Sequence, residues 1–451
     1  MPSWLTPSWR GELRMTGNGH SLLGKKAFES LPGWEQALIQ LEMNSQALSR
    51  PYLPAGIRTV GEKVAAMCSI LDWVYYEECR PYATLPDGRW IPHSPPDENM
   101  QSCSGSGQRR SHTAMSQLLS SLFSQMVEAI KKKDWEETIR WGGALGHFLQ
   151  EPFSPGHAMD NNLFHLLFPD PDPNRHLRLH HAFDAAIGDF EPLPARLLGT
   201  SIAEAVFRLQ VEIDRGIVEG MKLVGRVIQS VYQGKPDHYR QKLLSGQCQR
   251  ATFVTASAWH TAFCIAFSRF SPEEVEGLKN LSLTALVPYF WHHCQYVDLL
   301  PGFLVKEGRK IPIHVWAEDG REIEVRDGFG MGGHMAAKFF VNGDVYPKFS
   351  CQVGLASRHR EGQTPNTRTS FFVEMDEEEN LIYSEDMEYH ARRLARVELV
   401  PGQPLQKVEV DLRGGRTLIL SCLSQPYRTP DGQVKFDLPH VAVCQPRLSK
   451  I

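Results

Sequence analysis

The spacing of apolar residues changes part-way along this chain, and that change limits the folds open to it. Up to about residue 270, apolar side chains recur every three or four positions, as in amphipathic helices. The clearest helical segments are 111–150, 202–232 and 251–267. After about residue 285, short β-rich runs bounded by Gly, Asp and Pro replace this pattern. The sequence therefore predicts a multidomain α-then-β chain, with a helical domain over 1–285 and a β-domain over 295–451.

The β-rich runs predict the type of the second domain. They are short, follow one another closely and are separated by turn residues, as expected of an antiparallel sandwich or jelly roll. The runs lie at 311–317, 348–356, 369–375, 407–412 and 416–423.

Composition excludes several classes of protein. A net charge of −4 offers no basic footprint for duplex nucleic acid. The nine cysteines are odd in number and contain no Cys-x-x-Cys pair, which argues against a disulfide framework and a zinc finger. No apolar run is long enough for a transmembrane helix. The opening MPSWLTPSWRGEL lacks the basic start and apolar run of a secretory signal, so we expect either a cytoplasmic protein or a truncated start.

One polar motif in the helical region predicts a metal site. His147 and Glu151 stand four residues apart, as do His180 and Asp184, so each pair shares one face of a helix. The intervening PFSPGH would end the first helix and let His157 point back toward it. Imidazole and carboxylate ligands are typical of zinc that serves hydrolysis. By spacing alone, a nearby histidine could replace His180; the alternatives are His165, His176 and His181.

In order and spacing, this motif resembles that of the zinc-dependent phospholipases C and the related single-strand-specific zinc nucleases. The family has His-x-x-x-Asp, a His six residues later, and then a second His-x-x-x-Glu or Asp pair. Here Glu151 stands where the family usually has the aspartate that bridges two metals. The resemblance therefore implies a mainly helical, zinc phospholipase C/nuclease-like bundle.

Two upstream segments extend the resemblance. The family has an early tryptophan followed by a histidine, and Trp9 and His20 match that order. Trp9 can instead be an ordinary apolar anchor, and it could bind metal through its amine only after cleavage. Asp87 and His93 resemble the family's remaining ligand pair, although the Pro-Asp-Gly sequence also suits a plain turn. If the alignment slips, the replacement ligands are Glu77, Glu78 and His112.

The resemblance implies a cluster of two or three zinc ions and phosphodiester hydrolysis. One ion would be held by His157, His180 and Asp184, a second by Asp87, His93 and His147, and the third by Trp9 and His20, with Glu151 as a bridge. Asp87 would also orient or deprotonate the attacking water. The substrate would be a phospholipid headgroup, as the Trp9–His20 interval favours, or a single-stranded nucleic acid, as the residue type of Asp184 favours.

The second domain resembles another family. The phrases DGFGMGGHMAAKFFV, YPKFSCQVGLA and VEVDLRGGRTLILSCL follow the order found in NPCBM carbohydrate-binding modules, which are galactose-binding-like jelly rolls. Residues 385–404 look like an insertion in that pattern. The resemblance implies a possible glycan partner, with no sugar-contacting residue identifiable. A non-catalytic scaffold that binds a glycan or protein is the alternative to an enzyme.

Overall fold

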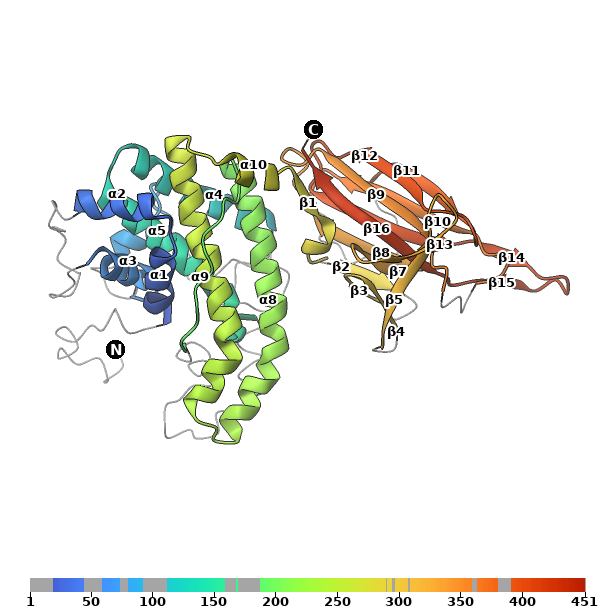
Figure 1. Ribbon diagram of the computed structural model, residues 1–451, viewed down its shortest axis with the longest axis horizontal. Coiled ribbons are helices and arrows are strands. Elements are labelled where there is room, and N and C mark those ends of the chain that lie inside the picture. Colours follow the sequence, from blue (N-terminus) through green and yellow to red (C-terminus); the bar gives the residue numbers. More distant parts are fainter. Residues whose placement is uncertain are drawn as a thin grey trace. The chain divides into compact units, whose positions relative to one another are not determined.

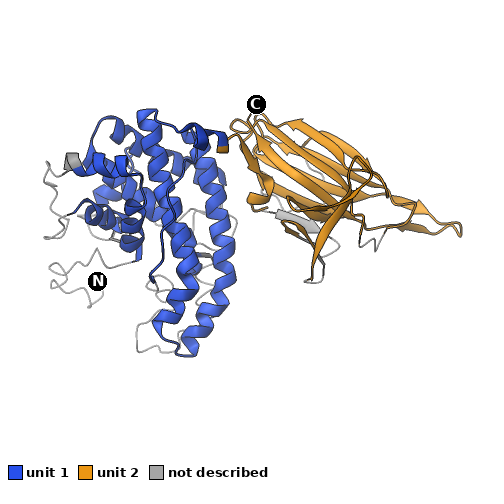
Figure 2. Ribbon diagram, viewed as in Figure 1, with its two compact units in different colours: residues 1–276 blue, residues 277–451 orange. Residues whose placement is uncertain are grey.

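The computed structural model divides the chain into two compact units, residues 1–276 and 277–451 (Figure 2). The structure describes residues 19–43, 59–73, 80–91, 112–158, 168, 187–288, 290–293, 297–306, 309–358, 363–379 and 391–450. The first unit is helical and the second is built of strands (Figure 1). The predicted order of helices first and strands afterwards is therefore confirmed.

The helical unit is dominated by long helices that share one apolar core. The α-helices described are α1 (Gly19–Glu29), α2 (Gly33–Met43), α3 (Val60–Cys68), α4 (His112–Lys131), α5 (Trp135–Gln150), α8 (Ile202–Tyr232), α9 (Asp237–Phe267) and α10 (Pro272–Gly277). Short 3₁₀ turns join some of them: η2 (Ile70–Trp73), η3 (Arg80–Ala83), η4 (Glu151–Phe153) and η5 (Pro155–Ala158).

Local sequence explains where several helices begin. The expected helix over 111–150 is divided in two, because Asp134 caps the start of α5 by accepting a hydrogen bond from the backbone N–H of Glu137. Thr59 and Glu62 form a reciprocal capping box at the start of α3. Ser201 caps α8 in the same manner as Asp134 caps α5. These caps fix the register of the helices that form the core.

Helix α5 lies at the centre of this unit. From Trp141 to Gln150 its side chains are buried without interruption, which leaves no solvent-facing side to its second half. Polar residues in that stretch, including His147, are therefore inside the protein. A buried polar side chain normally requires a hydrogen-bond or ion partner.

The β unit contains two five-stranded antiparallel sheets (Figure 1). The first has β1 (Asn280–Ser282), β16 (His440–Ser449), β9 (Lys348–Leu355) and β12 (Gln406–Asp411) in that order, and β7 (Gly328–Gly332) also pairs with β16. The second runs β11 (Arg392–Leu399), β10 (Thr369–Asp376), β13 (Thr417–Ser424), β8 (His334–Phe340) and β2 (Phe290–His293). Ring centroids of Phe329 on β7 and Phe339 on β8 lie 6.1 Å apart, so the sheets pack face to face there.

A four-stranded sheet covers the other side of the first sheet. It consists of β3 (Val297–Leu300), β4 (Phe303–Lys306), β5 (Arg309–Trp316) and β6 (Glu322–Val325). Ala442 and Cys444 of β16 share a core with Leu304 of β4. A Cβ on Gly330 would lie 2.1 Å from a Leu304 methyl carbon, so glycine permits this close approach. A further hairpin joins β14 (Pro426–Arg428) to β15 (Val434–Phe436). Among the described helices of the whole chain, none has the length and apolarity needed to cross a bilayer.

Candidate metal centre

The predicted pair His147 and Glu151 lies where α5 ends. Glu151 caps the helix, its backbone N–H bonding to the carbonyl oxygen of His147. Pro152 follows and cannot continue the helical hydrogen-bond ladder, so the chain turns through η4 and η5. That turn carries His157 back beside Glu151, as the PFSPGH sequence predicts.

Three imidazoles surround the Glu151 carboxylate. The Nε2 atom of His20 lies 2.8 Å from Oε1 of Glu151, and Nε2 of His147 lies 3.4 Å from the same oxygen. The Nε2 atom of His157 lies 2.8 Å from the other oxygen, Oε2. We call these four residues, His20, His147, Glu151 and His157, the histidine–glutamate cluster. All except His20 are buried, and His20 is half-buried.

The opposite nitrogens of two rings are held by outer partners. His147 donates from Nδ1 to the backbone carbonyl of Cys68 over 2.8 Å, and His20 donates from Nδ1 to the side-chain oxygen of Gln150 over 3.0 Å. Such bonds select the tautomer that leaves Nε2 free of a proton and fix the orientation of the ring. The rings of His20 and His147 also lie against each other, with centroids 4.1 Å apart.

The donor set fits a zinc ion. Ligand atoms of His20, His147 and Glu151 all lie within 4.8 Å of one another. Imidazole nitrogens and a carboxylate are the ligands of hydrolytic zinc sites, and the outer hydrogen bonds to two rings are those found behind metal-binding histidines. Burial raises the pKa of the Cys68 thiol, whose backbone carbonyl oxygen holds the His147 ring.

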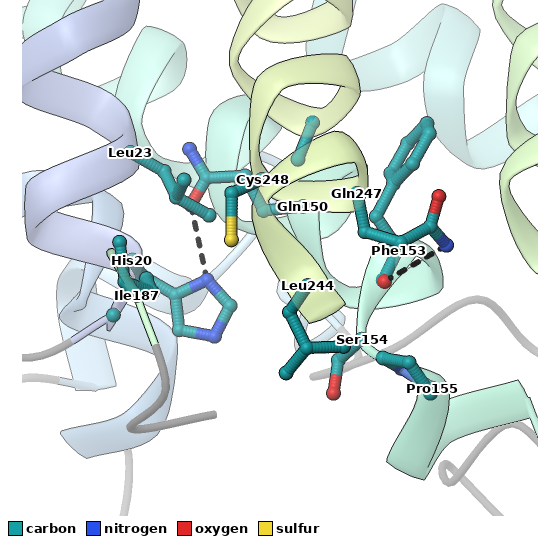
Figure 3. A pocket seen from close by; sticks show the side chains of 12 residues that line it. His20, Leu23, Gln150, Phe153, Ser154, Pro155, Ile187, Leu244, Gln247 and Cys248 are labelled. Carbon is teal, nitrogen blue, oxygen red and sulfur yellow. Dashed lines mark hydrogen bonds between the residues drawn. The ribbon is translucent and has the colours of Figure 1, made fainter. Parts of the chain in front are cut away.

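A small pocket of about 40 Å³ adjoins the cluster (Figure 3). Its polar lining includes His20 and Gln150, while Leu23 and Leu244 contribute apolar surface. The side-chain amide of Gln247 on α9 donates to the carbonyl of Phe153 over 3.2 Å, which ties the turn after Glu151 to the long helix. The cluster is therefore supported by α1, α3, α5 and α9.

The other predicted ligands are placed as follows. Trp9, His93, His180 and Asp184 lie outside the described residues, as do the alternatives Glu77, Glu78, His165, His176 and His181. His112 pairs with Asp214 at 2.9 Å. Asp87 is half-exposed in a turn and pairs with Arg89, whose hydrogen bond holds the pKa of the Asp87 carboxyl below its usual value. Metal binding by all these residues stays a prediction.

Sequence reasoning missed two supporting groups. Gln150 carries no signal, because a glutamine beside a motif glutamate is indistinguishable from any helical residue. The Cys68 carbonyl could not be identified either, since a backbone oxygen acts here only through a contact between positions 79 residues apart.

No family model matches this chain. No curated protein matches it. Alpha toxin from Clostridium absonum is 10% identical, with a TM-score of 0.31, over 89% of this chain and 84% of that one. Alpha-toxin from an avian strain of Clostridium perfringens is 8% identical, with a TM-score of 0.28, over 96% of this chain and all 100% of that one. A Clostridium perfringens CBM51 module in complex with methyl-galactose is 18% identical, with a TM-score of 0.28, over 38% of this chain and 99% of that one. These likenesses are weak and assign the chain to no family.

Proposed function

We propose that this chain is a zinc-dependent phosphodiester hydrolase of the phospholipase C-like type. The observation that carries the proposal is the convergence of three Nε2 atoms on both oxygens of the Glu151 carboxylate. The sequence resemblance to the zinc phospholipases C and zinc nucleases supports it. In this proposal the first unit is a bundle of that family, and the β unit is a galactose-binding-like jelly roll.

The chemistry follows from the ligand types. Bound zinc lowers the pKa of a water molecule and offsets negative charge on the attacking and leaving oxygens of a phosphodiester. His20, His147 and His157 would hold the metal, and Glu151 would bridge two ions. Gln150 and the Cys68 carbonyl would keep two of the rings in place. The remaining proposed ligands are Trp9, Asp87, His93, His180 and Asp184.

The first test is metal content. We expect two or three zinc ions per chain in the purified protein, together with hydrolysis of a generic phosphodiester. His157→Ala should lose at least one ion and most of the activity, because its Nε2 atom lies against Glu151. Mass spectrometry of both samples gives the metal count. Protein that stays inactive and metal-free after zinc is added would support the non-catalytic scaffold instead.

Asp87→Asn tests the proposed role of Asp87 with the attacking water. We expect activity to fall by about 100-fold or more, the usual contribution of a group that moves a proton in the transition state. The side chain is half-exposed, so the melting temperature should change little. Unchanged steady-state hydrolysis by the variant would remove Asp87 from the mechanism.

The substrate class is tested by direct comparison. Phosphatidylcholine micelles and single-stranded DNA are offered to the same enzyme preparation. We expect release of a phosphorylated headgroup from the lipid to be the faster reaction. Faster cleavage of DNA would assign the nuclease function of the same fold.

For the β unit we propose glycan binding. The proposal rests on the order of its sequence segments, which resembles that of NPCBM carbohydrate-binding modules. Retention of the full chain on immobilised galactose, reversed by free galactose, is the expected result. A chain that passes through galactose and glucose columns equally would contradict galactose recognition.

A further inference from the structure

A second buried group of metal-ligand residues lies elsewhere in the helical unit. His260 and Cys264 stand four residues apart on α9, and Glu35 reaches them from α2. The Nδ1 atom of His260 is 2.6 Å from Oε1 of Glu35, and the Cys264 sulfur is 3.7 Å from Nδ1. All three residues are buried, and their ligand atoms lie within 4.8 Å of one another. This group shares no residue with the histidine–glutamate cluster.

The far side of the His260 ring has its own partner. Nε2 lies 3.2 Å from Oε1 of Glu274 on α10, and the same oxygen accepts the backbone N–H of Leu197 over 3.0 Å. A carboxylate behind one ring nitrogen is the usual outer partner of a histidine that binds metal through the other nitrogen. The charge of the Arg269 guanidinium acts on Glu35. This guanidinium also stacks over Trp34, with its Cζ atom 4.4 Å from the ring centroid.

One carboxylate oxygen of this group makes no hydrogen bond to the residues that the structure describes. Oε2 of Glu35 is buried and has no hydrogen-bond partner among the residues that the structure describes. The side chain of Glu35 is fully buried. A buried carboxylate oxygen without a hydrogen bond lowers the stability of the folded protein, and the packing of the neighbouring side chains does not offset this cost. A cation seated between Glu35 and its neighbours would satisfy that oxygen.

We propose that Glu35, His260 through Nδ1 and Cys264 form a second zinc site, with Glu274 holding the ring from behind. For usual Zn–S and Zn–N lengths, a tetrahedral site separates sulfur from nitrogen by roughly 3.6 Å. The Cys264 sulfur lies 3.7 Å from Nδ1, close to that spacing, and 3.6 Å from Nε2, which faces Glu274. The carboxylate–imidazole hydrogen bond would open to admit the ion. One thiolate and one carboxylate neutralise Zn²⁺, so the loaded site carries no net buried charge.

The zinc site is tested by cobalt substitution in the full chain. Chelator-treated protein is titrated with Co²⁺, because a cobalt–thiolate bond gives a charge-transfer band in the near ultraviolet that imidazole and carboxylate ligands do not give. We expect the band in the wild-type protein and its loss in Cys264→Ser. Glu274→Gln should keep the band and weaken Co²⁺ binding by about 10- to 100-fold.

Two further variants make the assignment specific. Cys248→Ser alters another buried cysteine of α9, one whose pKa burial raises to about 12, and it should keep the band. His157→Ala should also keep it while losing phosphodiesterase activity, so failure of the catalytic proposal and failure of this one are separable. A wild-type protein without the band at saturating Co²⁺, or a band that survives in Cys264→Ser, would overturn the second site.

Discussion

Glu151→Gln is expected to abolish most phosphodiesterase activity and to lower the zinc content of the protein. The carboxylate lies against three imidazoles, and an amide offers one weak oxygen ligand in place of two charged ones. Loss of an outer partner of a metal ligand usually costs 10- to 100-fold, so loss of the shared ligand should cost more than about 100-fold. Steady-state hydrolysis and metal analysis on the same preparation measure both effects.

Glu137→Gln is the matched control. Glu137 lies on the same helix and pairs with Arg140 at 2.8 Å, away from the cluster. A partly exposed ion pair of this kind contributes at most about 1 kcal/mol, so zinc and activity should be retained. If both glutamine variants behaved alike, or if Glu151→Gln kept its zinc, Glu151 would have no role as a bridging ligand.

Gly143→Ala is expected to destabilise the helical unit and to disturb the metal centre with one methyl group. A Cβ at Gly143 on α5 would lie 2.6 Å from the carbonyl carbon of Met67 and 2.8 Å from its oxygen. These are backbone atoms of α3, so the helices must separate. Overpacking of this type costs about 1–3 kcal/mol, and more where backbone must move. Because Cys68 follows Met67, its carbonyl would shift from His147, and zinc affinity should fall as well.

Gly225→Ala provides the comparison in a helix that has room. Nothing lies within 4 Å of a Cβ built at Gly225 in α8, so alanine should stabilise the protein by about 0.4–1 kcal/mol through the unfolded chain. Urea unfolding measures both variants, and zinc titration of Gly143→Ala measures the second effect. Equal stability of Gly143→Ala and wild type would show that α3 and α5 pack less tightly than the structure has them.

The sequence predicted those helices, strands and side-chain pairs that depend on residues close together in the chain. Helical periodicity predicted 202–232, the bounds of α8. The spacing of His147 and Glu151 predicted that their side chains lie close together, and they are 3.4 Å apart. The run 348–356 contains β9, and the run 369–375 covers β10 except for its last residue, Asp376. These features depend on residues a few positions apart, so a single sequence is enough to predict them.

Other elements depend on long-range contacts or on unfavourable composition. Residues 392–399 looked like part of an insertion, yet they form β11, which pairs with β10 at the edge of the second sheet. Its three arginines and one glutamate interrupt the apolar pattern by which a strand is recognised in a sequence, although charged residues are common on edge strands. No sequence motif marks His260, because its partner Glu35 is 225 positions away.

The bond between His20 and Gln150 joins positions 130 residues apart, and that separation determines when the proposed metal centre can form. The hydrogen bonds within α5 join residues a few positions apart, but His20 reaches this helix only after a long loop has closed and its conformational entropy has been lost. An ion held by both segments binds the completed fold and not the open chain. A higher zinc concentration would therefore increase the fraction of molecules in which α1 is packed against α5. The occupancy of that ion would measure this fraction.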